Sequence, residues 1–485
     1  MNSARTPLVE FLSGGDITPI IEEAKYLLEQ TGVFVENEEA LRLLKDAGAT
    51  SDTERKRVLF PPELVEKCLE TCPRRIEIYD RQGNPALDLS GNNTYFDPGS
   101  AALKIFDFEK GVSRPPLVDD AIKLGRLADS LAHIRAQSTA IVPSDVPEEM
   151  SDRLRLYVAL RCSTKPVITG TFVKESFAVM KEMLVAVRGS EAALKAKPLA
   201  IFDACPSPPL KWSDLTCQSL IDCSKSGIPS ELVSMPLSGA TSPVTLAGSL
   251  VQHTAENLSG IVIHQLARPG SPIIYGGSPA FFDMRNGTTP MGAIETMMID
   301  CAFSQVGKSL GVPTHAYMGL SDSRTVDYQA GLESGLGAVL AMLAGINVVS
   351  GVGMMEFEKC QSLEKLFLDN DICGMAYRLR DGITVNEETL AREVFKEATL
   401  DTSFLRSKHT LKWFKKEGFF PGAGIDRSAG TEGKPVTAFE RASAEVKRIL
   451  ETHIVPPMPQ EVLSQLKSIV DRDLSAHGIK REWKF

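Results

Sequence analysis

The sequence predicts an α/β protein built on a (β/α)₈ TIM barrel, and three observations carry the prediction. Short apolar runs with strand character recur from residue 93 onward, each is followed by a segment of helical periodicity, and several helices end at a glycine. Eight such units in roughly 290 residues match the usual unit length of a barrel. A doubly wound open sheet would also alternate, but no G-x-G-x-x-G with its acidic partner and no G-x-x-x-x-G-K-[ST] is present. The barrel is therefore favoured over the open sheet.

Residues 1–92 are expected to form a helical cap with a small β element. Three stretches carry apolar residues at helical spacing, and Thr18 with Pro19 fits a cap followed by a first-turn proline. The stretches are "ITPIIEEAKYLLEQTGV", "NEEALRLLKDAGA" and "PPELVEKCLETCP". After them "RRIEIYDRQGN" alternates like a strand and turns at Gln82–Gly83–Asn84.

Residues 93–385 are assigned to the barrel and residues 386–485 to a helical extension. The eight strands are expected to begin near residues 93, 133, 165, 197, 228, 271, 312 and 346. In the extension, "NEETLAREVFKEATL" and "MPQEVLSQLKSIVDRDLSAHG" have helical character. The basic and aromatic stretch between them, "FLRSKHTLKWFKKEGFFPGAGIDR", is expected to pack over one end of the barrel.

Composition excludes several classes of protein. Of 485 residues 43% are hydrophobic and 24% are charged, which is ordinary for a globular chain, and a net charge of −9 disfavours nucleic acid or an anionic membrane as a partner. There is no apolar run of membrane-spanning length and no signal-peptide core, so a cytoplasmic location is expected. The nine cysteines lack zinc-site spacing and are expected to be buried free thiols.

The segments that follow the strands hold the candidate site, because TIM-barrel chemistry lies at the carboxyl ends of the strands. Aromatic residues are 7% of the chain, yet several occur at these positions. The candidate substrate-binding residues are Tyr95, Phe96, Asp97, Phe172, Tyr275, Phe281, Phe282, Arg285, His315 and Tyr317. His315, Asp322 and Glu356 are the candidates for a catalytic role beyond positioning.

The absence of several motifs narrows the range of reactions that the protein could catalyse. No strand ends in a lysine, which disfavours a Schiff-base aldolase, and no G-x-S-x-G elbow is present. Without H-E-x-x-H or another histidine pair at ligand spacing, no metal site is expected. Aromatic rings with few charges suit a quaternary ammonium ion, through cation–π attraction of about 0.5–2 kcal/mol per ring. The carboxylate of Asp97, Asp322 or Glu356 could add negative charge.

Each of these residues also has a structural interpretation. Any one tyrosine or phenylalanine at a strand end can be core packing, and His315 can be a core histidine. Asp322 can cap the following helix, and Arg285 can simply pair with Asp283. The residues taken alone support a barrel enzyme with an aromatic mouth and nothing more specific.

Longer stretches resemble the trimethylamine:corrinoid methyltransferase family, in particular the members that lack pyrrolysine and act on glycine betaine and related quaternary amines. The matching segments are "LLEQTGVFVENEEALRLLKDAGA", "VLFPPELVEKCLETCPRRIEIYDRQGN", "SDSRTVDYQAGLESGLGAVLAMLAGINVVSGVGMME" and "HTLKWFKKEGFFPGAGIDR". The resemblance implies a barrel that passes a methyl group to cob(I)alamin carried by a separate corrinoid protein. The chain has no D-x-H-x-x-G corrinoid motif, so no tightly bound cofactor is expected, and a homo-oligomer is expected.

One departure from the trimethylamine members concerns the substrate. Those members carry pyrrolysine near the position of Gly319–Ser323, where this chain has "GLSDS". A quaternary ammonium leaves as a neutral tertiary amine and needs only a strong nucleophile and correct placement. The resemblance therefore favours glycine betaine, giving dimethylglycine. Phe281 and Phe282 would face the methylated nitrogen, and Arg285 or a pair of backbone amides would take the carboxylate.

Two alternatives stay open at this level. The same reaction could act on proline betaine, carnitine or γ-butyrobetaine, since one sequence does not define the size of the pocket. From another class, the protein could be a non-catalytic betaine-binding protein that has kept the barrel.

Overall fold

Eight parallel strands surround the axis of the molecule in the computed structural model, which describes residues 6–485 except 53, 55, 400–401, 429–435 and 480–484. Hydrogen bonding runs in the order β6, β18, β17, β15, β13, β11, β10, β9, and a parallel bridge from Phe96 to Ile134 joins the two ends. The predicted TIM barrel is confirmed. The strands are β6 (Tyr95–Phe96), β9 (Gln137–Ser138), β10 (Val167–Thr169), β11 (Ala200–Ala204), β13 (Ser230–Leu232), β15 (Ile273–Gly277), β17 (Thr314–Tyr317) and β18 (Val348–Ser350).

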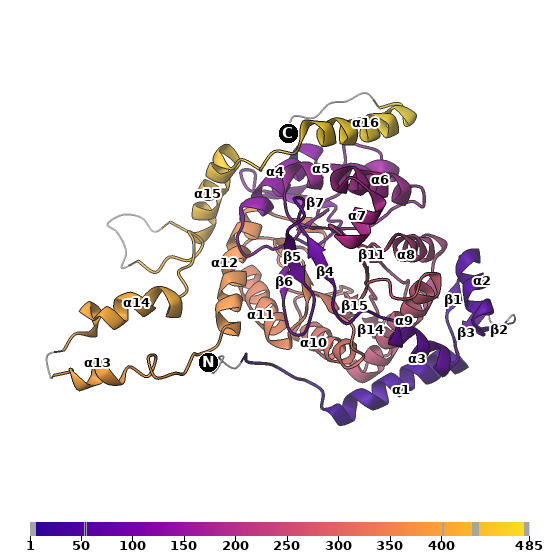
Figure 1. Cartoon of the computed structure of the whole chain (residues 1–485), viewed down its shortest axis with the longest axis horizontal. Coiled ribbons are helices and arrows are strands. Elements are labelled where there is room, and N and C mark those ends of the chain that lie inside the picture. Colours follow the sequence, from indigo (N-terminus) through magenta and orange to yellow (C-terminus); the bar gives the residue numbers. More distant parts are fainter. Residues whose placement is uncertain (1–5, 53, 55, 400–401, 429–435, 480–484) are drawn as a thin grey trace.

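Helices cover the outside of the barrel (Figure 1). Gly227 and Gly345 end two of them in the left-handed conformation, with φ of 70° and 67°, where glycine avoids the Cβ penalty. The barrel helices are α4 (Val118–Ser130), α5 (Glu148–Cys162), α6 (Ser176–Arg188), α7 (Glu191–Ala196), α8 (Asp214–Ser226), α9 (Leu246–Ala267), α10 (Ile294–Ser309), α11 (Tyr328–Ala344) and α12 (Leu363–Arg380).

A hairpin closes the amino end of the barrel. It consists of β4 (Glu77–Tyr79) and β5 (Pro85–Asp88), whose Ile78 and Leu87 are buried. These two side chains form one apolar cluster with a ring of inward-facing strand residues. The ring contains Ala136, Ile168, Ile201, Ile274 and Val348. The barrel therefore has an apolar floor at this end.

The rest of the N-terminal region packs on the outside of α9 through α1, α2 and α3. Helix α1 begins at Gly14 and not after Thr18, because the Ser13 backbone N–H donates to Asp16 Oδ2 at 2.9 Å, so Pro19 lies inside the helix. The elements are α1 (Gly14–Gln30), β1 (Phe34–Val35), α2 (Glu38–Asp46), β2 (Thr50–Asp52), β3 (Arg57–Leu59) and α3 (Pro62–Glu70).

Short strands border the other end, which we call the mouth. The strands β7 (Lys104–Asp107), β8 (Val112–Arg114), β19 (Met354–Met355) and β20 (Cys360–Gln361) form one sheet. The pair β14 (Leu237–Ser238) and β16 (Ala280–Phe281) lies in the loops after β13 and β15, and β12 (Lys211–Trp212) pairs with β1.

The C-terminal region divides into two parts with different surroundings. Helices α15 (Ala438–Thr452) and α16 (Gln460–Ala476) pack on barrel helices. An arm, described for residues 386–399 and 402–428, carries α13 (Arg392–Lys396), the 3₁₀ helix η1 (Phe404–Arg406) and α14 (Lys408–Glu417), and it projects from the barrel (Figure 1). None of these three elements buries a residue, so the expected packing of the basic, aromatic stretch on the barrel is not seen at η1 and α14. Beyond α14 the stretch does contact the barrel, because the rings of Phe419 and His133 lie 5.8 Å apart and the Gly422 backbone N–H donates to Asp371 of α12 at 2.9 Å.

Candidate functional site

A polar layer lies directly above the apolar floor of the barrel. Side chains on a strand alternate between its two faces, so a residue two positions beyond a floor residue also points to the axis. Asp203 follows Ile201 in this way, and Ser350 follows Val348. The layer consists of Asp97, Ser138, Asp203, Glu231, His315 and Ser350. Each comes from a different strand or its end, and together they line the deepest part of the mouth.

Hydrogen bonds connect three of these side chains, those of Asp97, Ser350 and His315. Ser350 Oγ donates to Asp97 Oδ2 at 2.7 Å, and the Gly99 backbone N–H donates to Asp97 Oδ1 at 2.8 Å. His315 Nε2 lies 3.1 Å from Ser350 Oγ and 3.5 Å from Glu231 Oε1. Because the Ser350 hydroxyl donates its one hydrogen to Asp97, His315 Nε2 carries the imidazole hydrogen and Nδ1 presents a lone pair.

Several polar atoms of the layer have no partner among the described residues. Both Glu231 carboxylate oxygens, Asp203 Oδ1, His315 Nδ1 and Ser138 Oγ are buried without a hydrogen bond. A shared proton between Asp203 and Glu231 is one way to satisfy two of the oxygens. Buried polar atoms in native proteins are almost always hydrogen-bonded, so a cluster of unpartnered ones marks a place for a ligand.

Burial controls the protonation of this layer. It raises the pKa of Asp97 to about 7 and that of Asp203 to about 6. Burial and then the neighbouring Asp203 carboxylate raise the pKa of Glu231 well above its usual value. Burial lowers the pKa of His315 to about 3, so its imidazole is neutral. Near neutral pH the layer therefore holds carboxyl groups that are poised between charged and neutral forms.

One cation, Arg155, lies beside the acidic layer. It projects from α5, is 3% exposed, and donates from Nη2 to the Thr139 backbone oxygen. Its guanidinium carbon lies 4.9 Å from the centre of the Phe172 ring, and its Nε has no partner among the described residues. Burial lowers its pKa to about 10, while the negative charges of Asp152 and Asp203 act to raise it. Arg155 thus stays positively charged at neutral pH.

The outer part of the mouth contains a cavity of about 740 Å³. It is lined by the β7–β8 hairpin, residues 287–289, Arg324, Glu356, Phe357 and Lys359. Glu356, Phe357 and Glu358 all have positive φ, of 50°, 59° and 65°. Non-glycine residues in this region cost about 1–3 kcal/mol each, and such strain tends to occur at functional sites.

Three side-chain contacts hold this strained segment in place. Glu356 forms a 2.7 Å ion pair with Lys104 Nζ and accepts a hydrogen bond from Ser113 Oγ. Glu358 accepts a 2.9 Å hydrogen bond from Ser278 Oγ, and burial raises its pKa to about 7. Glu356 therefore anchors the loop, while Glu358 adds a further carboxyl group to the mouth.

Asp322 joins two loops of the mouth. Its Oδ1 accepts from the Met291 backbone N–H at 2.9 Å and its Oδ2 from the Gly292 backbone N–H at 2.8 Å. Burial raises its pKa to about 6. Helix α11 is capped instead by Asp327, which accepts from the Ala330 backbone N–H. Asp322 thus fixes the loop after β15, which carries Phe281 and Phe282.

The structure brings together three of the residues that the sequence analysis selected. Asp97 and His315 lie in the polar layer, and Tyr317 is two positions beyond His315 on the same face of β17. The rings of His315 and Tyr317 meet edge to face with centres 5.3 Å apart. These residues form the inner wall of the mouth.

Three of the selected aromatic residues lie elsewhere. Phe96 points outward and packs edge to face on Tyr377 of α12, with ring centres 5.7 Å apart. Tyr275 also points outward, where its hydroxyl lies 3.0 Å from Thr254 Oγ1 of α9. Tyr95 faces inward but joins the apolar floor at the amino end. The sequence predicts that these three rings lie at the mouth, and the structure places them away from it.

The remaining selected residues are at the rim. The guanidinium of Arg285 is bound to Asp283, and the Arg285 side chain is 87% exposed. This agrees with the structural interpretation of Arg285 in the sequence, a simple pair with Asp283. Phe281 and Phe282 are half-buried, and neither belongs to a buried core cluster. Phe172 is half-buried, with the guanidinium of Arg155 over its ring.

Sequence reasoning missed Glu231, Arg155 and Glu358, and did not select Asp203. The sequence holds a signal for two of them, because Asp203 and Glu231 are carboxylates inside otherwise apolar strands, where burying a charge is costly unless it is paired or hydrogen-bonded. Arg155 had no such signal, since it lies on a helix and reaches the site from outside the sheet.

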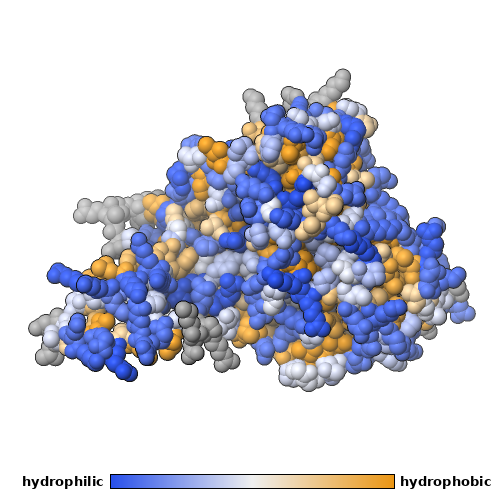
Figure 2. Space-filling model, in the orientation of Figure 1, coloured by the Kyte–Doolittle hydropathy of each residue, from blue (hydrophilic) through white to orange (hydrophobic). Residues whose placement is uncertain are grey.

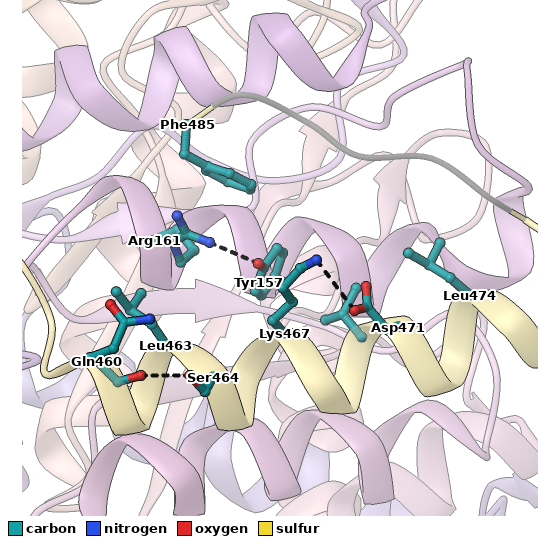
Figure 3. A pocket seen from close by; sticks show the side chains of 10 residues that line it. Tyr157, Arg161, Gln460, Leu463, Ser464, Lys467, Asp471, Leu474 and Phe485 are labelled. Carbon is teal, nitrogen blue, oxygen red and sulfur yellow. Dashed lines mark hydrogen bonds and ion pairs between the residues drawn. The ribbon is translucent and has the colours of Figure 1, made fainter.

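A second cavity lies outside the barrel. It has a volume of about 430 Å³ and lies between the last turns of α5 and the length of α16. There Arg161 donates to the Tyr157 hydroxyl at 2.8 Å (Figure 3). The ring of Phe485 lies 4.1 Å from the Arg161 guanidinium. Because α5 begins at the mouth and runs toward the amino end, this groove is remote from the polar layer.

The described part of the chain contains no group of three His, Cys, Asp or Glu side chains arranged to hold a metal ion. None of its helices has the length and apolar character that a membrane crossing requires. All nine cysteines are unpaired, and all except the half-buried Cys205 are buried.

The amino-acid sequence of the chain is similar to those of known proteins. The model of the trimethylamine methyltransferase (MTTB) family matches residues 2–478. Trimethylamine methyltransferase MttB of Desulfitobacterium hafniense (strain DSM 10664 / DCB-2) is 30% identical over 94% of this chain and 92% of the relative. Glycine betaine methyltransferase of D. hafniense (strain Y51) is also 30% identical, over 96% of this chain and 97% of the relative. The solved monomethylamine methyltransferase MtmB of Methanosarcina barkeri aligns with a TM-score of 0.49 at 11% identity, covering 91% of this chain and 94% of that structure.

Proposed function

The chain belongs to the trimethylamine methyltransferase (MTTB) family, and from this premise we propose that it moves a methyl group from a quaternary amine to the Co(I) of a cognate corrinoid protein. Glycine betaine is the proposed substrate and dimethylglycine the product. The observation that carries the proposal is the buried acidic layer of Asp97, Asp203 and Glu231 with its unpartnered oxygens. This layer supplies negative potential at the bottom of a one-ended pocket.

The acidic layer favours a cationic methyl donor. Attraction between charges is strong where water is excluded, and a quaternary ammonium brings a fixed positive charge at every pH. The neutral His315 adds no competing positive charge. The half-buried Phe281 and Phe282 lie in the loop after β15, where they can shield the methyl groups from water.

The proposed transfer needs no proton. The electron pair of Co(I) forms the new cobalt–carbon bond as the carbon–nitrogen bond breaks, and its electrons stay on nitrogen as the lone pair of dimethylglycine. The protein must bind the ammonium, orient one methyl group toward the mouth and exclude water. Asp97, Asp203 and Glu231 serve the first task, and the loop fixed by Asp322 serves the last.

The choice between quaternary and tertiary amines rests on the leaving group. Trimethylamine and glycine betaine both occur as substrates in the names of the similar proteins. The segment Gly319–Ser323 contains only standard residues, and a quaternary amine leaves without an activating group. Proline betaine, carnitine and γ-butyrobetaine are the alternatives for the same reaction. A non-catalytic betaine-binding protein is the alternative of another class.

A spectral assay with cob(I)alamin tests the proposal. The protein is mixed with cob(I)alamin and with glycine betaine, proline betaine, carnitine, γ-butyrobetaine or trimethylamine, and methylcobalamin is followed. We expect methylcobalamin with glycine betaine and none with trimethylamine. Turnover of trimethylamine at a comparable rate would contradict the quaternary specificity. Binding of betaine without any methyl transfer, also with corrinoid protein present, would favour the binding-protein alternative.

We further propose that the protein forms homo-oligomers through its arm and the outer face of α11. The arm exposes large apolar side chains, which Figure 2 shows among hydrophilic ones at the lower left. These are Leu390, Phe395, Phe404, Leu405, Leu411, Phe414 and Phe420. Helix α11 exposes Tyr328, Leu332 and Leu336, with Gly331 and Gly335 between them. Both surfaces would be covered if a second copy exchanged arms with the first, and large exposed apolar patches commonly mark interaction sites.

A further inference from the structure

We propose that Arg155 receives the carboxylate of the substrate, so that the site selects zwitterionic betaines over simple quaternary ammonium ions. The inference rests on the proposed function and deepens it. It also replaces Arg285, which the sequence analysis named beside a pair of backbone amides for this task and which is exposed and bound to Asp283 in its own loop.

Unused hydrogen-bonding capacity is the first argument. A guanidinium has five N–H donors, and buried ones are nearly always satisfied. Arg155 is 3% exposed, yet its Nε has no acceptor among the described residues, and the protein acceptor of its Nη2 is a neutral carbonyl, that of Thr139. Arginine binds carboxylates through two parallel N–H bonds, and this side chain has capacity for such a pair.

The position of Arg155 is the second argument. Asp203 and Tyr317, which both face the barrel axis, lie close enough to act on its charge. The Phe172 ring stacks on the guanidinium and limits its rotation, leaving the edges of the plane free for hydrogen bonds. One fixed cation therefore borders the acidic layer. A ligand with a positive and a negative group a few bonds apart can satisfy both at once.

The charge of the pocket is the third argument. Burial and the neighbouring Asp203 carboxylate raise the pKa of Glu231 and so reduce the negative charge of the layer, and the Arg155 cation opposes part of the charge that remains. A zwitterion enters without changing the net charge of the pocket. Choline or tetramethylammonium would satisfy the acids but leave the Arg155 donors buried and unpaired, which costs binding free energy.

Binding measurements on the full-length protein test the inference. Glycine betaine, its methyl ester, choline and tetramethylammonium are titrated calorimetrically into the wild-type protein. We expect glycine betaine to bind on the order of tenfold or more tightly than its methyl ester, which keeps the ammonium but has no carboxylate. Equal affinities for the two compounds would overturn the inference without the need for any variant.

Variants then assign the effect to a residue. Arg155→Met should weaken glycine betaine on the order of tenfold to a hundredfold and change tetramethylammonium by less than about threefold. Arg155→Lys should recover part of the affinity for glycine betaine. Arg161→Met is the matched control, because it makes the same replacement six residues later on α5, at the outer groove of Figure 3. It should leave both affinities unchanged.

The outcomes separate this inference from the proposed function. If Arg155→Met weakens both ligands equally, or Arg155→Lys restores nothing, Arg155 supports the fold and the inference is wrong. Methyl transfer from glycine betaine in the cobalamin assay would leave the proposed function standing in that case. If no quaternary amine binds the wild-type protein, the proposed function itself fails. Should Arg155→Met not fold, the wild-type comparison of betaine with its ester still decides the matter.

Discussion

Ser350 at the end of β18 donates a 2.7 Å hydrogen bond to Asp97, which directly follows β6. This contact joins the last strand of the barrel to the first within the polar layer. It also stabilises the charged form of Asp97 against the burial that raises its pKa to about 7. Ser350 thereby influences how much negative charge the pocket presents at a given pH.

Binding of glycine betaine should strengthen as pH rises from about 5.5 to 8. Asp97 and Asp203, with pKa values of about 7 and 6, lose protons in this range and gain the charge that attracts the ammonium. Calorimetric titration at a series of pH values measures the effect. Ser350→Ala removes a donor to Asp97 and should move the midpoint to higher pH. An affinity that is flat or that falls with pH would contradict the assignment of these carboxylates.

The ligand-free protein should lose stability over the same range. An unfolded aspartate has a pKa of about 3.9, so the folded state, in which these values are raised, binds protons more tightly. That contribution to stability is fully present below about pH 4 and is lost as pH rises through the folded values of about 6 and 7. Melting temperatures should therefore fall less between pH 5.5 and 8 in Asp97→Asn than in the wild type. Identical falls would show that Asp97 titrates normally.

Asp322→Ala should release the loop after β15. The change removes the acceptor of two backbone N–H groups, those of Met291 and Gly292, at a cost of about 1–3 kcal/mol each in the stability of the loop contact. We expect weaker binding of glycine betaine and a modest fall in melting temperature. Asp283→Ala is the control, since that carboxylate pairs with Arg285 at the rim. Unchanged betaine affinity in folded Asp322→Ala would mean that the loop does not shape the pocket.

Phe282→Ala should weaken binding of glycine betaine about tenfold with a near-normal melting temperature, as expected for one lost cation–π contact. Phe281 belongs to β16 and its backbone N–H donates to Thr296 Oγ1 at 3.1 Å, so its neighbour on the chain points to the opposite side. Phe281→Ala should therefore affect stability more than binding. A collapse of the melting temperature in Phe282→Ala, with betaine affinity intact, would reverse the two assignments.

Leu411→Glu on α14 and Leu332→Glu on α11 should each convert the protein to smaller species in analytical ultracentrifugation. Both side chains are exposed, at 67% and 51%, so the folded chain should tolerate the charge while an interface would not. Tyr26→Glu, at a 57% exposed position on α1, is the control and should leave the mass unchanged. If the wild-type protein is a monomer at tens of micromolar, the arm has another partner.

The sequence was most informative about the elements of the barrel. All eight strands lie where short apolar runs predicted them, because a strand covered on both faces leaves a continuous apolar run. The sequence was less informative about the direction in which the side chains point. Their positions at strand ends predict that Phe96 and Tyr275 lie at the mouth, yet alternation along β6 and β15 turns both rings toward the helices. Which face of a strand points to the axis depends on its register with the neighbouring strands. The sequence of a single strand does not contain this information.

The polar layer was predicted only in part. Asp97 and His315 were selected because each lies at the end of a strand, whereas Glu231 lies inside an apolar strand and was overlooked. Arg155 could not be placed, because helical periodicity did not indicate which side of α5 meets the barrel end. The convergence of these groups is a property of the closed ring and becomes visible only when all strands are positioned.

The hairpin of β4 and β5 closes the amino end of the barrel, and this has a kinetic consequence. For the proposed reaction, with the amino end closed by the apolar floor, amine and methyl acceptor would both have to approach the polar layer from the mouth. The amine must occupy the deeper position before the larger corrinoid protein covers the opening, and the demethylated amine can depart only after that protein has left. Steady-state rates should accordingly follow a compulsory order, with amine first, and an excess of corrinoid protein should inhibit by occupying the free enzyme.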